Sequence, residues 1–376
     1  MIVGVDIRHL AAPNPSGIGI YTLNVIREMA RSAPEVRFLL FASGSEQARA
    51  NLPKFDEPNI ALCVVRWPNR IVSSLLKIPK GPGLEDMMYE KPDVWFFPNL
   101  NIIRTRLPYV VTIHDMSFRI FPEFFTQKDL AWHRAVNAKR LLKKATHVVA
   151  VSESTKHDLE KYYQISKDKI TVAYHGAQKR FHNSEEPQDK NFLREHNIDF
   201  PYLLSLCTLE PRKNIESILE AYDDWQESNQ NETHLVIAGG AGWKTDGIEE
   251  VFEKLKHQDK IHFLGYVPDN HKPALYRHAS ALLFPSFYEG FGLPALEAMA
   301  SGTPVITSFT GSMPEVVGDA AIMVDPYNVS DLKQALDELM SDVELRKKLI
   351  DSGIKRAQKF TWEKTAKKTL SALYLH

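Results

Sequence analysis

Two glutamates lie on either side of a glycine-bearing loop that leads into a predicted helix. Glu289 and Glu297 are separated by seven residues, so one precedes the helix start near Leu293 and the other lies about one turn inside it. Gly290 and Gly292 leave backbone N–H groups uncovered at the helix N-terminus, where phosphate or sugar oxygens can bind. The segment therefore predicts a ligand site that both carboxylates can reach. Two surface carboxylates on an ordinary strand–turn–helix unit would give the same isolated pair.

A basic pair opens another predicted helix, directly after the apolar strand Tyr202–Leu206. Arg212 and Lys213 lie in Leu209-Glu-Pro-Arg-Lys-Asn214. They combine a fork-shaped donor with a compact cation, a pairing suited to a diphosphate at the positive end of a helix. Taken alone, such a pair is more often simply solvated, and its register with the glutamate segment favours phosphate binding.

The first half of the chain adds a histidine and a glycine loop. His114 closes the run Val111-Thr-Ile-His114, at the carboxyl end of a strand, where open α/β sheets bind ligands. Gly17 and Gly19 follow the first strand within Pro15-Ser-Gly-Ile-Gly-Ile-Tyr21. The third glycine of a dinucleotide fingerprint is replaced by Thr22, which argues against that use. For both glycines, plain turn geometry and ligand contact stay open.

Short apolar runs alternate with helical patterns along the chain, which is typical of βαβ units and parallel sheets. The predicted strands of the first half are Ile2–Val5, Arg37–Phe41, Ile60–Val65, Val94–Phe97, Tyr109–Ile113, His147–Val151 and Ile170–Val172. Those of the second half are Tyr202–Leu206, His234–Ala238, Ile261–Leu264, Ala281–Phe284, Val305–Thr307 and Ala321–Val324. Helices are expected between them, including a continuous one over Leu130–Lys144, and a polar linker is expected within Gln178–Phe200.

The bulk composition fits a two-domain enzyme. The 376 residues exceed what one core usually organises, and 44% hydrophobic with 25% charged residues is ordinary for a globular protein. A net charge of -1 argues against a nucleic-acid binder. The start Met1–Asp6 carries no secretory leader, and no run of about 18 apolar residues occurs, so a cytoplasmic location is expected. Cys63 and Cys207 sit in apolar stretches and are predicted to be buried thiols.

The segment Glu289-Gly-Phe-Gly-Leu-Pro-Ala-Leu-Glu-Ala-Met-Ala-Ser-Gly-Thr-Pro-Val305 resembles the Glu-x7-Glu motif of the retaining glycosyltransferases of family 4. Gly311-Ser-Met-Pro-Glu315, Val324-Asp-Pro326 and the Arg212-Lys213 element resemble the same family, although many members have Gly-Arg where this chain has Cys207-Thr208. The resemblance implies the GT-B fold, in which two Rossmann-like domains face each other across a cleft. It places the acceptor-side domain at 1–183 plus a returning helix at 361–376, and the nucleotide-sugar domain at 199–358.

The resemblance also implies roles for individual residues. Glu289 and His114 are the catalytic candidates, Glu289 as a residue that positions the donor sugar and His114 as a contact of the sugar or acceptor. The residues expected to bind the donor and its phosphates are Gly17, Arg212, Lys213, Gly290, Phe291, Gly292, Leu293 and Glu297, the last on the ribose. Gly239, Tyr266 and Val267 are expected around the nucleotide base. The nucleotide sugar is a co-substrate, and neither a cofactor nor a metal is expected; Asp223-Asp224 is better explained as part of a helix than as a metal pair.

The implied reaction moves a sugar, with mannose and a GDP-mannose donor favoured, to a hydroxyl of a glycan or lipid-linked acceptor, as in surface-polysaccharide assembly. Two alternatives stay open: a nucleotide-sugar hydrolase or epimerase on the same fold, and a catalytically silent sugar-nucleotide-binding subunit. Basic and aromatic residues gather at 66–80 and at 132–144. They fit either a solvated helix face or peripheral contact with the inner face of the plasma membrane.

Overall fold

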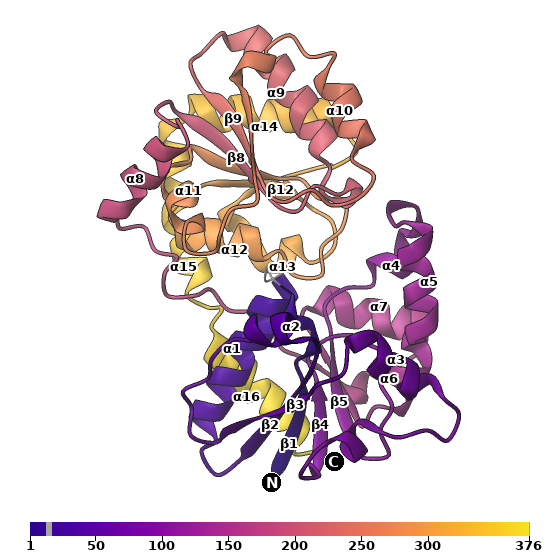
Figure 1. The fold of residues 1–376 in the computed structure, drawn as a ribbon. Helices are drawn as coiled ribbons and strands as arrows, with labels where there is room; N and C mark the ends of the chain where they lie inside the picture. Colours follow the sequence, from indigo (N-terminus) through magenta and orange to yellow (C-terminus); the bar gives the residue numbers. More distant parts are fainter. Residues whose placement is uncertain (13–16, 376) are drawn as a thin grey trace. The chain divides into compact units, whose positions relative to one another are not determined.

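A computed structural model describes residues 1–12 and 17–375, which form two compact units (Figure 1). Unit 1 comprises Met1–Met116, Gln127–Gly176 and Thr361–His376. Unit 2 comprises Ser117–Thr126 and Ala177–Phe360. The sequence-based boundary had given 117–126 and 177–183 to the first domain, whereas the structure groups both segments with unit 2.

Unit 1 is built on a parallel sheet of seven strands in the order β3-β2-β1-β4-β5-β6-β7. Every residue of the central strands β4 and β5 is buried, as expected for a parallel sheet covered on both faces. The strands are β1 (Ile2–Asp6), β2 (Arg37–Ser43), β3 (Ile60–Val65), β4 (Val94–Phe97), β5 (Tyr109–Ile113), β6 (His147–Ala150) and β7 (Ile170–Val172).

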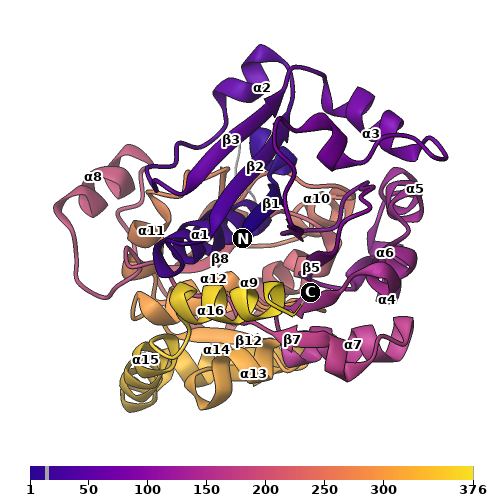
Figure 2. The same cartoon turned by 90° about the horizontal axis from the view of Figure 1, so that it is seen from below.

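Seven α-helices accompany this sheet within the described residues. They are α1 (Gly17–Ser32), α2 (Glu46–Ala50), α3 (Asn69–Lys77), α5 (Gln127–Val136), α6 (Ala138–Lys144), α7 (Glu153–Tyr163) and α16 (Trp362–Leu373). Figure 2 shows α16, the last helix of the chain, beside α1, against which it packs. The expected continuous helix over 130–144 is wrong, because Asn137 adopts a left-handed conformation and its side chain caps α6 at Arg140 N. Ser152 caps α7 in the same way.

Unit 2 repeats the parallel pattern with six strands in the order β10-β9-β8-β11-β12-β13. The strands are β8 (Tyr202–Leu206), β9 (His234–Ala238), β10 (Ile261–Gly265), β11 (Ala281–Phe284), β12 (Val305–Ser308) and β13 (Ile322–Val324). In each sheet the strand order reverses next to the first strand of the unit, at β1 and β8. At such a reversal the neighbouring loops diverge and leave room for a ligand.

Nine α-helices belong to unit 2 within the described residues. They are α4 (Ser117–Ile120), α8 (Pro187–Glu195), α9 (Ile215–Asn229), α10 (Asp246–Phe252), α11 (Lys272–His278), α12 (Leu293–Ala300), α13 (Met313–Val317), α14 (Val329–Ser341) and α15 (Val343–Ala357). The expected linker contains α8, so that part of the prediction is wrong. Arg277 on α11 holds α8 through two bonds to the buried carboxylate of Asp189, at 2.6 and 2.7 Å.

Across the described part of the chain, no helix combines the length and apolar composition needed to span a membrane. Cys63 and Cys207 are both buried free thiols, as predicted.

Candidate active site

The loop between β11 and α12 carries Glu289 and closes on a glycine. Gly292 precedes α12 with φ +91°, in the left-handed region that favours glycine. A Cβ at this position would lie 2.7 Å from the side chain of Met313, so a larger residue would also meet a steric barrier. The Glu289 carbonyl accepts hydrogen bonds from the N–H and hydroxyl of Ser312, at 3.1 and 3.0 Å. The backbone on both sides of the first carboxylate is therefore fixed.

The two predicted cations both bind this carboxylate. Arg212 Nη1 lies 2.9 Å from Glu289 Oε2, and Lys213 Nζ lies 2.5 Å from Glu289 Oε1. Arg212 also donates to Glu210 Oε1 at 2.6 Å and to the carbonyl of Tyr288 at 3.0 Å. Lys213, Glu210 and Glu289 are all buried. The four side chains carry two positive and two negative charges, so the cluster is neutral as a whole.

Electrostatics keep Glu289 ionised. Burial acts to raise the pKa of its carboxyl group, but the charges of Arg212 and Lys213 outweigh burial and lower the pKa below its ordinary value. The carboxylate is therefore an acceptor for hydrogen bonds throughout the neutral pH range.

The start of α9 locks the basic pair against the glutamate loop. Asn214 is left-handed, at φ +58°, and its amide donates to the carbonyls of Pro285 and Pro326, at 3.1 and 2.7 Å. Phe287 N donates to the carbonyl of Arg212 at 3.0 Å. Residues from three sequence-distant loops thus meet at the carboxyl ends of β8, β11 and β13.

The second glutamate lies in a different environment. Glu297 is buried on α12, and the Tyr276 hydroxyl donates to its Oε2 at 3.1 Å. Burial raises the pKa of Glu297 to about 7, against an opposing effect of the positive charge of Lys272. Asp269 reinforces the rise, while Tyr276 and Arg180 oppose it. Glu297 can therefore take up or release a proton near neutral pH.

The residues predicted around the nucleotide base follow β9 and β10. Gly239 has φ +151°, and a Cβ there would lie 1.6 Å from the carbonyl oxygen of Cys207, so glycine lets the loops after β8 and β9 touch. Tyr266 is 43% exposed, which leaves its ring available to a ligand, whereas Val267 is buried. These positions are compatible with a base pocket, and the base contact itself stays a prediction.

A short segment from the first half of the sequence packs beside the glutamate loop in unit 2. Trp243 Nε1 donates to the carbonyl of Phe124 at 2.7 Å, and the Phe124 ring stacks on Phe287 at 5.4 Å. Phe121 lies 5.8 Å from Tyr288, the residue before Glu289. The sequence interpretation missed this contact, and only the run of aromatic residues at 118–125 hinted at a packed segment.

The remaining two candidates lie in unit 1. His114 follows β5, and its Nε2 lies 2.8 Å from the carbonyl oxygen of Pro98, so Nε2 carries the proton and Nδ1 is the acceptor. Burial lowers the pKa of His114 to about 4, so the ring is neutral at pH 7. Its neighbours are the rings of Tyr21, in an edge contact at 4.7 Å, and His175 at 5.5 Å.

Gly17 is the exposed first residue of α1, while Pro15 and Ser16 of the predicted loop lie outside the described residues.

Within unit 2 the structure brings Arg212, Lys213 and Glu289 into direct contact, as the sequence interpretation expected for a common site. Phe291 is buried, and Gly290, Phe291 and Gly292 connect Glu289 to the first helical residue, Leu293. Sequence reasoning missed Glu210, which binds Arg212 beside the first glutamate, and it missed the surroundings of the second glutamate: Tyr276, Lys272, Asp269 and Arg180. Of these, Glu210 alone had a signal, its place inside the basic motif.

Asp223, weighed above as a metal ligand, instead accepts hydrogen bonds from the backbone of Lys256 and His257.

Comparisons with known proteins agree with this architecture. Residues 15–179 match the family model Glycosyltransferase Family 4, and residues 188–356 match the model Glycosyl transferases group 1. The chain is 30% identical over 275 residues to the uncharacterized glycosyltransferase MJ1607 of Methanocaldococcus jannaschii, covering 71% of this chain and 69% of that protein. It is 29% identical to the O-antigen chain mannosyltransferase B of Escherichia coli, over 96% of both chains.

Among solved structures, sucrose-phosphate synthase from Thermosynechococcus elongatus has a similar fold, with a TM-score of 0.78, 19% identity, and coverage of 100% of this chain and 98% of that one. Two parallel sheets, the clustered basic and acidic residues after β8 and β11, and the two family matches lead to one assignment. The chain belongs to glycosyltransferase family 4 and is an enzyme built on the GT-B fold of two Rossmann-like domains.

Proposed function

We propose that this enzyme transfers mannose from GDP-mannose, with retention of anomeric configuration, to a hydroxyl of a surface-polysaccharide or lipid-linked acceptor. The observation that carries the proposal is the buried contact of Arg212 and Lys213 with Glu289, directly before α12. The mannosyl donor and polysaccharide acceptor are supported by the similarity over 96% of the chain to a protein named an O-antigen chain mannosyltransferase.

The chemistry of sugar transfer needs positive charge where the leaving diphosphate develops negative charge. In the proposed reaction the diphosphate binds Lys213 and Arg212, and the N–H groups at the start of α12 add further donors. Glu289 then turns from the cations to hydroxyls of the donor sugar. Its role is to position the sugar as an ionised acceptor. The second carboxylate, Glu297, accepts hydrogen bonds from the ribose hydroxyls.

His114 offers a neutral acceptor at Nδ1, which suits a sugar hydroxyl better than a phosphate. The residues of unit 2 bind and orient the nucleotide sugar without supplying a separate base for the acceptor. The acceptor proton passes, in this proposal, to an oxygen of the departing phosphate. We further propose that neither a metal nor a bound cofactor takes part, and that the enzyme works in the cytoplasm.

A thermal-shift panel of nucleotide sugars tests the donor. GDP-mannose at about 100 times its dissociation constant should add about 2.7 kcal/mol to the stability of the folded state. We expect a shift with GDP-mannose and a much smaller one with UDP-glucose or UDP-N-acetylglucosamine. Lys213→Ala should abolish the ligand-induced shift, while the matched control Lys256→Ala, an exposed lysine of the same unit, should keep it.

Product analysis separates the remaining possibilities. Proton NMR of the product should show the anomeric configuration of the donor, and an inverted product would contradict retention. Release of free mannose at the same rate with and without acceptor would instead identify a hydrolase. Donor binding without turnover, with any acceptor tested, would identify a silent binding subunit.

A further inference from the structure

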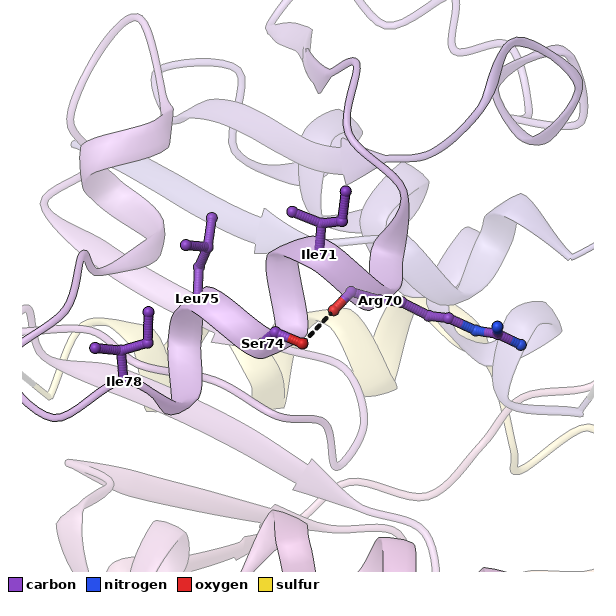
Figure 3. A pocket seen from close by; sticks show the side chains of 5 residues that line it. All are labelled: Arg70, Ile71, Ser74, Leu75 and Ile78. Carbon is purple, nitrogen blue, oxygen red and sulfur yellow. Dashed lines mark hydrogen bonds between the residues drawn. The ribbon is translucent and has the colours of Figure 1, made fainter.

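Helix α3 in unit 1 presents two apolar faces, and the core needs one of them. Val72 and Leu76 point inward and are almost fully buried. Figure 3 shows Ile71, Leu75 and Ile78 directed to another side of the helix, at the i, i+4, i+7 spacing of a single stripe. A helix at the edge of a soluble unit normally carries polar residues on its second face. The outer stripe of α3 therefore calls for an explanation.

The outer stripe is open to solvent. Ile71 and Ile78 are 49% and 48% exposed, and Trp67, just before the helix, is 48% exposed. Ile71, Leu75 and Ile78 line a hollow of about 360 Å³, completed by Arg70 and Ser74 (Figure 3). Exposed large apolar side chains that gather in one place mark an interaction surface.

The charges around this stripe have one sign. Arg66, Arg70, Lys77 and Lys80 are all exposed and lie within fifteen consecutive residues. Within the described residues none of the four forms an ion pair, and the sequence has no aspartate or glutamate from 58 to 84. The whole chain has a net charge of -1, so this concentration of positive charge is local.

We propose that this surface, Trp67, Ile71, Leu75 and Ile78 with Arg66, Arg70, Lys77 and Lys80, docks on an anionic lipid bilayer. The apolar side chains enter the boundary between headgroups and acyl chains, and the cations remain at the level of the lipid phosphates. The local positive charge favours an anionic lipid surface as the binding partner, because each cation near an anionic membrane adds to the affinity of a short amphipathic helix.

Both views of the molecule place α5 and α6 on the same side of unit 1 as α3 (Figures 1 and 2). These helices add the exposed ring of Trp132 and the exposed cations Lys139, Arg140, Lys143 and Lys144. They add further exposed positive charge to that side of unit 1. The inference rests on the proposed function in one respect, since a lipid-linked acceptor gives the enzyme a reason to work at a membrane.

Vesicle flotation with the full chain tests the inference. The wild type should float with vesicles of equal parts phosphatidylglycerol and phosphatidylcholine, should bind pure phosphatidylcholine vesicles weakly, and should lose binding at high salt. Each cation near an anionic surface adds roughly fivefold to binding, so Arg70→Glu/Lys77→Glu should weaken it by at least about 30-fold. The matched control Lys348→Glu/Lys355→Glu, on exposed positions of α15, should bind like the wild type.

The apolar contribution has its own pair of variants. Ile71→Ser should weaken vesicle binding, whereas Val343→Ser, at an equally exposed position of unit 2, should not. Circular dichroism establishes that each variant is folded. Wild-type protein that stays with the lipid-free fraction, or an Arg70→Glu/Lys77→Glu variant that floats normally, would overturn the inference.

Two further measurements separate this inference from its neighbours. Light scattering tests whether the surface instead binds a second copy of the chain. A dimer that Ile71→Ser disrupts, in a protein that does not bind vesicles, would assign the surface to dimer formation and contradict membrane docking. Transfer of mannose to a water-soluble acceptor should be unchanged in Ile71→Ser. Vesicle binding without any mannose transfer would leave the docking surface standing and remove the proposed function.

Discussion

The surroundings of Glu289 and Glu297 show how one motif gives two identical side chains opposite properties. Both carboxyl groups are buried, and burial acts to raise the pKa of each. Around Glu289 two cations lie within 3 Å of its oxygens and lower its pKa, whereas the nearest partner of Glu297 is the neutral hydroxyl of Tyr276. The environment therefore divides the tasks: a permanent anion faces the cation pair, and a titrating acid sits inside the helix.

The largest effect is expected from removing one cation of the Glu289 cluster. Lys213→Ala takes away a donor to the leaving diphosphate, so we expect kcat to fall about 100- to 1000-fold. It also leaves a buried carboxylate with one partner fewer, at a cost of about 3 kcal/mol in the free energy of unfolding. Steady-state kinetics and urea denaturation measure the two effects, with Lys256→Ala as the control.

A double variant separates these two effects. In Lys213→Ala/Glu289→Gln the buried negative charge is gone, so stability should recover while activity should not. Recovery of both would mean that Lys213 serves Glu289 alone and does not touch the donor.

The same substitution at the two glutamates should have unequal effects on folding. Glu289→Gln leaves Arg212 and Lys213 without their carboxylate and should lower the free energy of unfolding by about 2 kcal/mol. Glu297→Gln resembles the protonated form that Glu297 already populates at pH 7, so its effect should stay within about 0.5 kcal/mol. Denaturation midpoints at pH 7 compare the pair, and equal losses would refute the division between them.

The pH dependence of donor binding should follow Glu297. Its carboxyl group must be ionised to accept hydrogen bonds from a ribose, and its pKa is about 7, set by burial with Lys272, Asp269, Arg180 and Tyr276 around it. We expect the dissociation constant of the donor to rise about fivefold between pH 7 and pH 6, and to level off above pH 8. Calorimetric titration of GDP-mannose measures this, and the profile of Glu297→Gln should be flat over the same range.

The contribution of Glu297 to folding stability should decrease as the pH rises, whereas donor binding should become tighter. The folded-state pKa of Glu297 exceeds its ordinary value of 4.5, so the folded state binds more protons between these two values. The contribution of Glu297 to stability is therefore full below about pH 4.5 and declines as the pH rises through 7. Glu289, with its lowered pKa, contributes stability that is lost only as the pH falls through its folded-state pKa.

The smallest effect is expected at the hydroxyl that contacts Glu297. Tyr276→Phe removes a donor that favours the carboxylate, so the midpoint of the donor-binding profile should move to higher pH by a fraction of a unit. Tyr222→Phe removes an equally buried hydroxyl, bound to the carbonyl of Thr233 at 2.9 Å, and should leave the midpoint unchanged.

Local pattern predicted the strands and the charged motif well, because each depends on neighbours in the sequence. The predicted and observed bounds of β3, β4, β5, β7, β8, β9 and β11 are identical. Lys213 and Glu289 were predicted to bind the same donor, and the structure shows them in direct contact. The glycine-bearing turn before α12 was likewise readable, since Gly292 and Pro294 mark a helix start.

Long-range partners account for what the sequence did not reveal. The polar composition of α8 suggested a linker. In the structure Asp189 of this helix binds Arg277, which lies 88 residues later in the sequence, and a local pattern does not reveal such a partner. Burial and the charge of Asp269 raise the pKa of Glu297, while Lys272, Tyr276 and Arg180 lower it, and all four residues are distant from Glu297 in the sequence. Asn137 interrupts an otherwise regular helical pattern, because its side chain accepts a hydrogen bond from Arg140 N and caps a new helix. The hydrophobic period does not reveal this cap.

Because α16 packs in unit 1, this unit can complete its folding only after the whole chain has been synthesised. The 184 residues from Ala177 to Phe360 must be translated before the helix that packs on α1 exists. At the usual rate of translation this takes about 10 to 40 s. During this time the surface of unit 1 that α16 later covers is exposed. Unit 2, apart from the early segment Ser117–Thr126, is continuous in the sequence, so the half that is synthesised second can mature first. The folding of unit 1 is therefore completed only by α16, and until then the apolar surface that α16 covers must be protected from other contacts.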